Sequence, residues 1–237
     1  MEMMSLHPFD PEVAGRYVAA VKGEAEPDAA WRSWWTPSLR EAVGEMASGN
    51  ESASNRLTLG LAWALASEYP SFTQMGFSLT TWEARVDRGI GMLMRPPSRL
   101  FVDAGLERSA VLSMPIRLDM MGGGMMGGAY VPAQSMARLA EVTDSHLERM
   151  AKRLHDAEND PYAVLDLMQR AISYAREQGL GLYEAQDAIG TASVPGLRLV
   201  EASDRKRMDP VLRERIRAAI EAEKRNRGFF SRFFRKE

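Results

Sequence analysis

The chain contains no cysteine among its 237 residues. This absence excludes a disulfide framework, a thiolate metal site and a cysteine nucleophile. Histidine is scarce too, with His7, His146 and His155 as the three examples. His146 and His155 lie on one predicted helix at a spacing that puts them on opposite faces, so they cannot share a metal ion. The sequence therefore predicts no metal site and no other cofactor.

Long apolar runs are also missing. The longest, LTLGLAWALA, has about half the length of a membrane-spanning helix. The N-terminal sequence MEMMSLHPFDP has neither the basic nor the apolar segment of a secretory signal. We therefore expect a cytoplasmic protein, with peripheral attachment to a membrane as an option that a short surface segment leaves open.

Neither sign of charge is in strong excess. The chain has 30 basic and 32 acidic residues, for a formal net charge of −2. This balance gives no overall attraction for nucleic acid or for an anionic membrane, so any such contact requires a local patch. No basic stripe follows the predicted helices, and we do not expect a nucleic-acid partner.

The length fits one large domain or one and a half small ones. We expect one compact domain with four regions: a helical N-terminal region over residues 1–96, a strand-rich middle over 97–132, a helical C-terminal region over 133–226, and a tail over 227–237. Helices surround a single strand-rich middle and do not alternate with strands. The predicted fold class is therefore α+β, mostly helical, with a small antiparallel sheet of three or four strands.

Capping residues and apolar periodicity predict the helices. They are expected over residues 11–21, 37–46, 55–68, 81–94, 136–154, 161–178 and 182–189, with a last helix starting at Asp209-Pro210. The helix over 55–68 is apolar almost all round, which indicates a buried central helix. The helices before and after the short link AEND should form an antiparallel hairpin.

Branched and aromatic residues predict the strands. We expect a hairpin from 99–103 and 109–119, in which Pro115 indicates an edge position or a bulge. Residues 129–131 should add a third strand and residues 197–201 a fourth.

Two side-chain clusters have both a structural and a functional interpretation. Trp31, Trp34 and Trp35 share one helical face, and large aromatics of this kind fill a core more often than they stack on a ligand. The carboxylate pairs Glu83/Asp87 and Asp144/Glu148 are interleaved with arginine. That pattern favours a solvated helix face with local ion pairs over an acid–base or metal site.

The segment MMGGGMMGG is the most unusual stretch of the chain. Its glycines cost backbone entropy and bury nothing, so we expect a flexible loop. Its methionines suit an adaptable contact with a partner, and the lack of cysteine or nearby histidine disfavours a copper(I) site. The predicted contact residues are Met120, Met121, Gly122, Gly124, Met125, Met126 and Gly127.

The same loop formally contains the dinucleotide-binding pattern G-x-G-x-x-G. That pattern requires a helix that opens on the last glycine, whereas residues 130–132 intervene here. The alternative function is nevertheless a small-molecule or nucleotide-binding enzyme that uses the Gly-rich loop at 122–128. Its first candidate residues, on position alone, are Arg117, Asp119 and Tyr130.

The C-terminal sequence GFFSRFFRKE is the sharpest functional feature. As a helix, its four phenylalanines fall within an uncharged arc of about 140°. A short basic segment with aromatics on one face is typical of an interfacial membrane helix or of a docking peptide for a partner groove. Folding back into the chain's own core is the alternative. The predicted docking residues are Phe229, Phe230, Phe233, Phe234, Arg227, Arg232, Arg235 and Lys236.

No acid, base, nucleophile or metal ligands converge in the sequence, and we predict no catalytic residue. We expect a non-enzymatic cytoplasmic interaction or regulatory protein. It should bind a protein partner or an anionic membrane surface through the tail, and a homo-oligomer is also left open.

Overall fold

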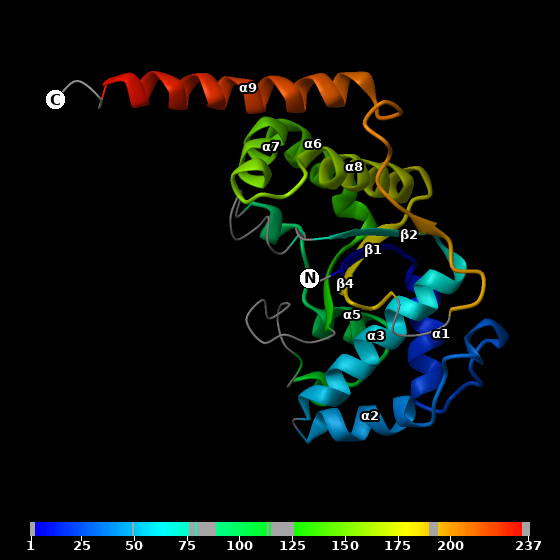
Figure 1. Cartoon of the computed structure of the whole chain (residues 1–237). Helices are drawn as coiled ribbons and strands as arrows, with labels where there is room; N and C mark the ends of the chain where they lie inside the picture. Colours follow the sequence, from blue (N-terminus) through cyan, green and yellow to red (C-terminus); the bar gives the residue numbers. More distant parts are fainter. Residues whose placement is uncertain are drawn as a thin grey trace.

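The computed structural model describes residues 3–48, 50–75, 79, 89–112, 114, 126–189 and 194–233. In this part of the chain, a single sheet lies between two groups of helices (Figure 1). One group contains α1 (Pro11–Val21), α2 (Ser38–Ala47), α3 (Glu51–Glu68) and α5 (Pro97–Asp103). The other contains α6 (Met136–Ser145), α7 (Leu147–Asp156) and α8 (Pro161–Glu177), with α9 (Pro210–Phe233) outermost. The predicted α+β class, mostly helical with one small sheet, is confirmed.

The sheet has five strands in the order β3-β4-β1-β2-β5. Their bounds are β1 (Met3–Phe9), β2 (Ser71–Met75), β3 (Met126–Val131), β4 (Gly181–Gln186) and β5 (Leu199–Val200). Three of the four pairings are antiparallel, but β5 runs parallel to β2. The expectation of a purely antiparallel sheet was therefore wrong. β4 and β5 run in the same direction. The chain that connects them must therefore return to the end of the sheet at which β4 began, and a hairpin, which reverses the chain direction, cannot make this connection.

The predicted hairpin is not present in the described residues. Residues 99–103 lie in α5, and residues 109–111 lie in the short 3₁₀ helix η3 (Arg108–Val111), while most of 112–119 falls outside the described residues. Pro97 occupies the first helical position and thus starts a helix. Leu100 and Phe101 are of residue types common in strands. They lie in that helix instead, and their side chains are buried.

The predicted helix over 182–189 was also wrong, because Gly181–Gln186 form strand β4. All six of its residues are buried, since the strand lies inside the sheet with helices on both faces. A strand buried on both faces shows no polar and apolar alternation. Strands β1 and β2 were missed as well, whereas the strands expected near 129–131 and 197–201 are present as β3 and β5.

Five predicted helices are confirmed near their expected bounds, namely α1, α2, α3, α8 and α9. Asp10 and Asp160 cap α1 and α8 by accepting hydrogen bonds from backbone N–H groups at 2.8 and 3.0 Å. The single helix expected over 136–154 is divided into α6 and α7 at His146. Of the helix expected over 81–94, residues 81–88 lie outside the described residues and 90–92 form a 3₁₀ turn, η2 (Ile90–Met92). Two further 3₁₀ turns are η1 (Ala29–Trp31) and η4 (Ala133–Ser135).

The sheet separates two apolar cores, one on the α1–α3 side and one on the α6–α9 side. Trp31 and Trp34 are buried in the first core, and the ring centroids of Trp34 and Trp63 lie 5.6 Å apart. The tryptophans thus serve packing, as the more common interpretation holds. The closest packing involves α1 and α3, where the Tyr17 hydroxyl occupies the space that a Cβ on Gly60 would need.

Candidate interaction surface on helix α9

Helix α9 begins at Asp209-Pro210, as the capping pattern predicts. The Asp209 Oδ1 atom accepts a hydrogen bond from the backbone N–H of Leu212 at 2.8 Å. Pro210 has no N–H and a fixed φ that suits the first helical position. The start of α9 is therefore satisfied locally and does not depend on a ligand or partner.

An apolar stripe on the first three turns attaches α9 to α7 and α8. Leu212, Ile216 and Ile220 follow one another at intervals of four residues, and each is less than a tenth exposed. Fully burying an aliphatic side chain of this size contributes about 1.5 to 3 kcal/mol. Val211 points away from this contact and is 66% exposed. The stripe therefore fixes which face of α9 meets the rest of the protein.

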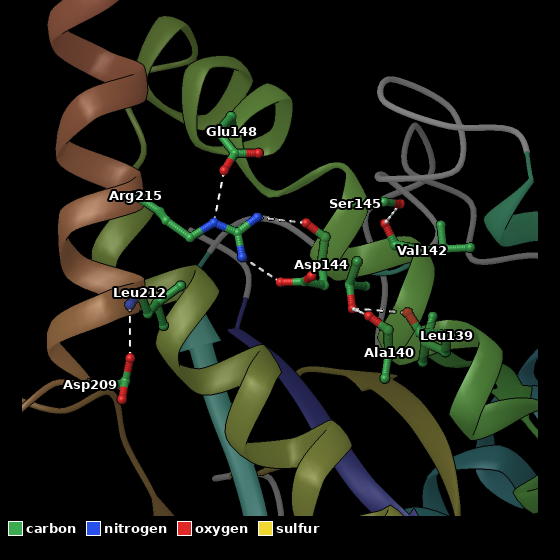
Figure 2. Close-up of polar contacts among 10 residues, drawn as sticks. Leu139, Ala140, Val142, Asp144, Ser145, Glu148, Asp209, Leu212 and Arg215 are labelled. Carbon is green, nitrogen blue, oxygen red and sulfur yellow. Dashed lines mark hydrogen bonds and ion pairs between the residues drawn. The ribbon is translucent and has the colours of Figure 1, made fainter.

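Arg215 adds a polar clamp on the same part of α9 (Figure 2). Its Nε donates to Glu148 Oε1 at 2.8 Å, and its Nη2 donates to the backbone carbonyl oxygen of Asp144 at 2.9 Å. Its Nη1 also donates to the Asp144 carboxylate. Asp144 lies in the last turn of α6 and Glu148 in the first turn of α7, so one guanidinium joins three helices.

The clamp favours the charged forms of Glu148 and Arg215. The hydrogen bond from Arg215 lowers the pKa of Glu148 below its ordinary value. The hydrogen bonds to Glu148 and Asp144 raise the pKa of Arg215. Hydrogen bonds between charged groups are roughly twice as strong as neutral ones, so the clamp holds at neutral pH.

Sequence analysis did not find this clamp. The pair Asp144/Glu148 was expected to form local ion pairs, but the ion pairs described for these carboxylates reach Arg215, 71 and 67 residues away. Helical spacing reports neighbours on one helix and carries no signal for a contact between distant helices.

The segment between β5 and α9 is also tied down. The buried carboxylate of Asp166 accepts a hydrogen bond from Ser203 N at 2.8 Å, and Arg170 donates to the Glu201 carbonyl oxygen at 2.8 Å. Arg205 pairs with Asp160 at 2.9 Å. Because its base is held on both sides, the direction of α9 relative to α8 is fixed.

The remainder of α9 carries most of the residues predicted to dock. The helix is continuous through Phe233 and extends past α7, away from the sheet (Figure 1). At 1.5 Å per residue, Phe233 lies about 20 Å beyond Ile220 along the helix axis. Phe229, Phe230, Phe233, Arg227 and Arg232 belong to α9, whereas Phe234, Arg235 and Lys236 lie outside the described residues.

The Gly/Met-rich loop is described only at its end. Met126 and Gly127 belong to edge strand β3 and pair with Gln186 and Ala185 of β4, so the predicted loop was wrong there. The register shifts between Gly127 and Tyr130, and an irregular edge strand accommodates glycine. The other predicted contact residues, Met120, Met121, Gly122, Gly124 and Met125, lie outside the described residues, as do Arg117 and Asp119.

This context does not match a dinucleotide site. The last glycine of the pattern, Gly127, lies in a strand and does not open a helix, so no helix N-terminus follows it to hold a phosphate. Tyr130 is buried and donates a hydrogen bond to Asp103 Oδ2 at 3.2 Å. Burial and the nearby Asp103 raise the pKa of Tyr130 to about 12, so it is a poor acid or base near neutrality.

A buried polar cluster that the sequence did not reveal lies on the sheet. His7 Nε2 is 2.9 Å from Ser5 Oγ, and His7 Nδ1 is 3.0 Å from Ser71 Oγ. Ser5 donates its own proton to the Ala185 carbonyl oxygen, so Nε2 must donate to Ser5 while Nδ1 accepts from Ser71. Burial lowers the pKa of His7 to about 3. All three side chains are buried, which makes the cluster part of the core and not a nucleophilic site.

Two further features bear on function. Among the described residues, no three histidine, aspartate or glutamate side chains are grouped so as to hold a metal ion. No helix in that part of the chain is long and apolar enough to cross a membrane. Comparison with protein-family models, curated proteins and solved structures found no match. The geometry of α9 and the charge distribution of the chain therefore carry the functional proposal.

Proposed function

We propose that this protein is a non-enzymatic interaction protein that binds an anionic membrane surface through the C-terminal half of α9. The observation that carries the proposal is the attachment of α9. Leu212, Ile216, Ile220 and Arg215 hold its first turns on α7 and α8, and the helix then continues past α7 (Figure 1). A helix held in this way presents its far end to the surroundings.

The C-terminal end of the chain carries an excess of positive charge, whereas the rest carries an excess of negative charge. Residues 224–237 carry six basic side chains and one acidic side chain, a formal charge of +5. Because the whole chain has a formal charge of −2, residues 1–223 carry −7. An anionic surface would attract the tail and repel the rest of the protein, so the molecule would approach tail first.

The composition of the tail favours a lipid surface over a groove on an unrelated protein partner. Each basic residue near an anionic membrane contributes about 1 kcal/mol, so six of them act together over a surface. A groove on a protein would need matching carboxylates at fixed positions to use the same charges. The uncharged arc of four phenylalanines would enter the interface between headgroups and acyl chains.

Vesicle binding tests the proposal. The full chain should sediment with vesicles that contain phosphatidylserine and not with neutral phosphatidylcholine vesicles. Binding should weaken steeply as salt is raised, because exposed charges are screened. Replacing the four phenylalanines by serine should abolish binding, while Val211→Ser, an exposed apolar position at the base of the same helix, should leave it unchanged.

Three results would contradict the proposal. One is an absence of binding to anionic vesicles at low salt. Another is equal binding by the serine variant, and the third is binding by Val211→Ser as weak as that of the serine variant. Capture of a protein partner with little dependence on salt would support a groove contact instead.

A further inference from the structure

A groove between α6 and α8 lies beside the attachment site of α9. Its volume is about 420 Å³. Ala137, Ala140, Glu141, Thr143 and Asp144 line it from α6, and Gln169, the buried Ile172, Ser173 and Arg176 line it from α8. The small alanine side chains on the α6 wall let another backbone approach closely, which suits a helix.

The same layer of helices already accepts one helix. α9 packs against α7 and α8, and Asp144 both lines the groove and pairs with Arg215 of α9. The groove is therefore continuous with an existing helix-binding surface. A second helix placed there would lie beside α9.

We propose that the groove binds the C-terminal end of α9 from a second copy of this chain. The chain's own tail cannot fold back onto it, because α9 is continuous through Phe233 and its far end extends past α7 (Figure 1). The sequence places four phenylalanines in the tail. A contiguous apolar surface is stabilised by cover, and a second copy is a surface that is always present. The inference depends on the same tail but not on its binding to membranes.

Charge and periodicity support this occupant. The tail with a charge of +5 is attracted to a body with a charge of −7. Phe230 follows Ile216 by 14 residues, so at 100° per residue the two positions lie within about 40° of each other around the helix. The periodicity of the sequence therefore continues the apolar positions Leu212, Ile216 and Ile220 into the tail, which a second copy can receive.

An exchange of tails between two copies fills both grooves. Each copy gives its tail and receives the other, which makes a closed, twofold-symmetric dimer with no free site. In this dimer the phenylalanines would be covered when no membrane is present. The membrane and the groove would then compete for the C-terminal end of α9.

Light scattering during size-exclusion chromatography, over a range of protein concentrations, tests the exchange. The full chain should pass from monomer to dimer as concentration rises. Ser173→Trp, at an exposed position on the groove wall, should shift this transition to at least tenfold higher concentration. Gln178→Trp, at the exposed C-cap of the same helix and outside the groove, should dimerise like the wild type. A chain ending at residue 223 should stay monomeric.

Mixing two defective chains provides the stricter test. The chain ending at residue 223 keeps its groove, and Ser173→Trp keeps its tail, so an equimolar mixture should form a heterodimer with one contact. A full chain that stays monomeric, a dimer that survives Ser173→Trp, or a mixture that stays monomeric would each overturn the inference. Ser173→Trp should still bind anionic vesicles, so failure of membrane binding and failure of the exchange give different results.

Discussion

Arg215 on α9 and Glu148 on α7 are joined by a hydrogen bond of 2.8 Å across 67 residues of sequence. The same guanidinium holds Asp144 at the end of α6. The division of the predicted long helix at His146 places these two acceptors on different helices. Helix α9 is therefore attached where the chain breaks between α6 and α7.

Removing the guanidinium should loosen α9 without unfolding the protein. Exposed ion pairs contribute about 0.2 to 1 kcal/mol each, so Arg215→Ala should lower the free energy of unfolding by no more than about 2 kcal/mol. Hydrogen exchange should become faster in residues 210–222, because their contact with α6 and α7 is weakened. Mass spectrometry of peptides from this segment would measure the change.

A matched control lies two residues away. Arg217 pairs with Glu214 on α9 itself, so Arg217→Ala removes an ion pair without removing a contact between helices. Its exchange rates should match the wild type. Equal acceleration in both variants would mean that the loss of any arginine on α9, and not the loss of the clamp, lowers the protection of this helix.

The buried His7 should make stability depend on pH. Its pKa is about 3 in the folded protein against an ordinary value of 6.5. Between these values the unfolded chain takes up a proton that the folded chain does not, so the free energy of unfolding falls as pH falls below 6.5. At pH 5 this loss is about 2 kcal/mol, at about 1.4 kcal/mol per pH unit.

Urea unfolding of wild type and variants from pH 7 to pH 5 would measure this loss. His7→Gln retains a donor and an acceptor but does not titrate, so its stability should fall less over that range. His155→Gln, at an exposed position on α7, should follow the wild type. Parallel curves for wild type and His7→Gln would contradict the assignment of the pH dependence to His7.

The contact between Tyr17 and Gly60 predicts that alanine has opposite effects on stability at two glycine positions. A Cβ on Gly60 would overlap the buried Tyr17 hydroxyl, so Gly60→Ala should destabilise the protein by about 1 to 3 kcal/mol. Gly44 lies in α2 with no atom near its Cβ position, so Gly44→Ala should stabilise it by about 0.5 to 1 kcal/mol. Thermal unfolding of both variants measures the contrast.

Tyr17→Phe provides a rescue, because it removes the atom that overlaps. In the Gly60→Ala background it should recover part of the lost stability, although the hydrogen bond from Tyr17 to the Leu57 carbonyl oxygen is also lost. If Gly60→Ala were neutral, the close packing of α1 on α3 would be refuted.

Local signals in the sequence predicted the helices well. The caps at Asp160 and Asp209 act within three residues, and the structure confirms them. The buried strands were not predicted, because β1 pairs with β4 in a register that places residues such as His7 and Tyr183 opposite each other, and no local pattern relates these residues. Strand register of this kind depends on tertiary packing.

The sequence predicted which residue types make up the candidate site but not how helix α9 is attached to the rest of the protein. The tail is visible in the sequence because its aromatics and basic residues are adjacent. The attachment of α9 is not, because Arg215 finds Asp144 and Glu148 only after α6, α7 and α9 have packed. Helical periodicity identified Leu212, Ile216 and Ile220 as the buried face, and the structure confirms it.

Two truncations should separate the attached part of α9 from the rest. A chain ending at residue 223 keeps Leu212, Ile216, Ile220 and Arg215, so its free energy of unfolding should lie within about 0.5 kcal/mol of the full chain. A chain ending at residue 209 loses three buried aliphatic side chains at about 1.5 to 3 kcal/mol each and should be several kcal/mol less stable. Urea unfolding at low protein concentration, where self-association does not contribute, would compare them. A large loss of stability in the chain ending at residue 223 would mean that the phenylalanines pack against the protein's own core, and both the membrane proposal and the exchange of tails would then fail.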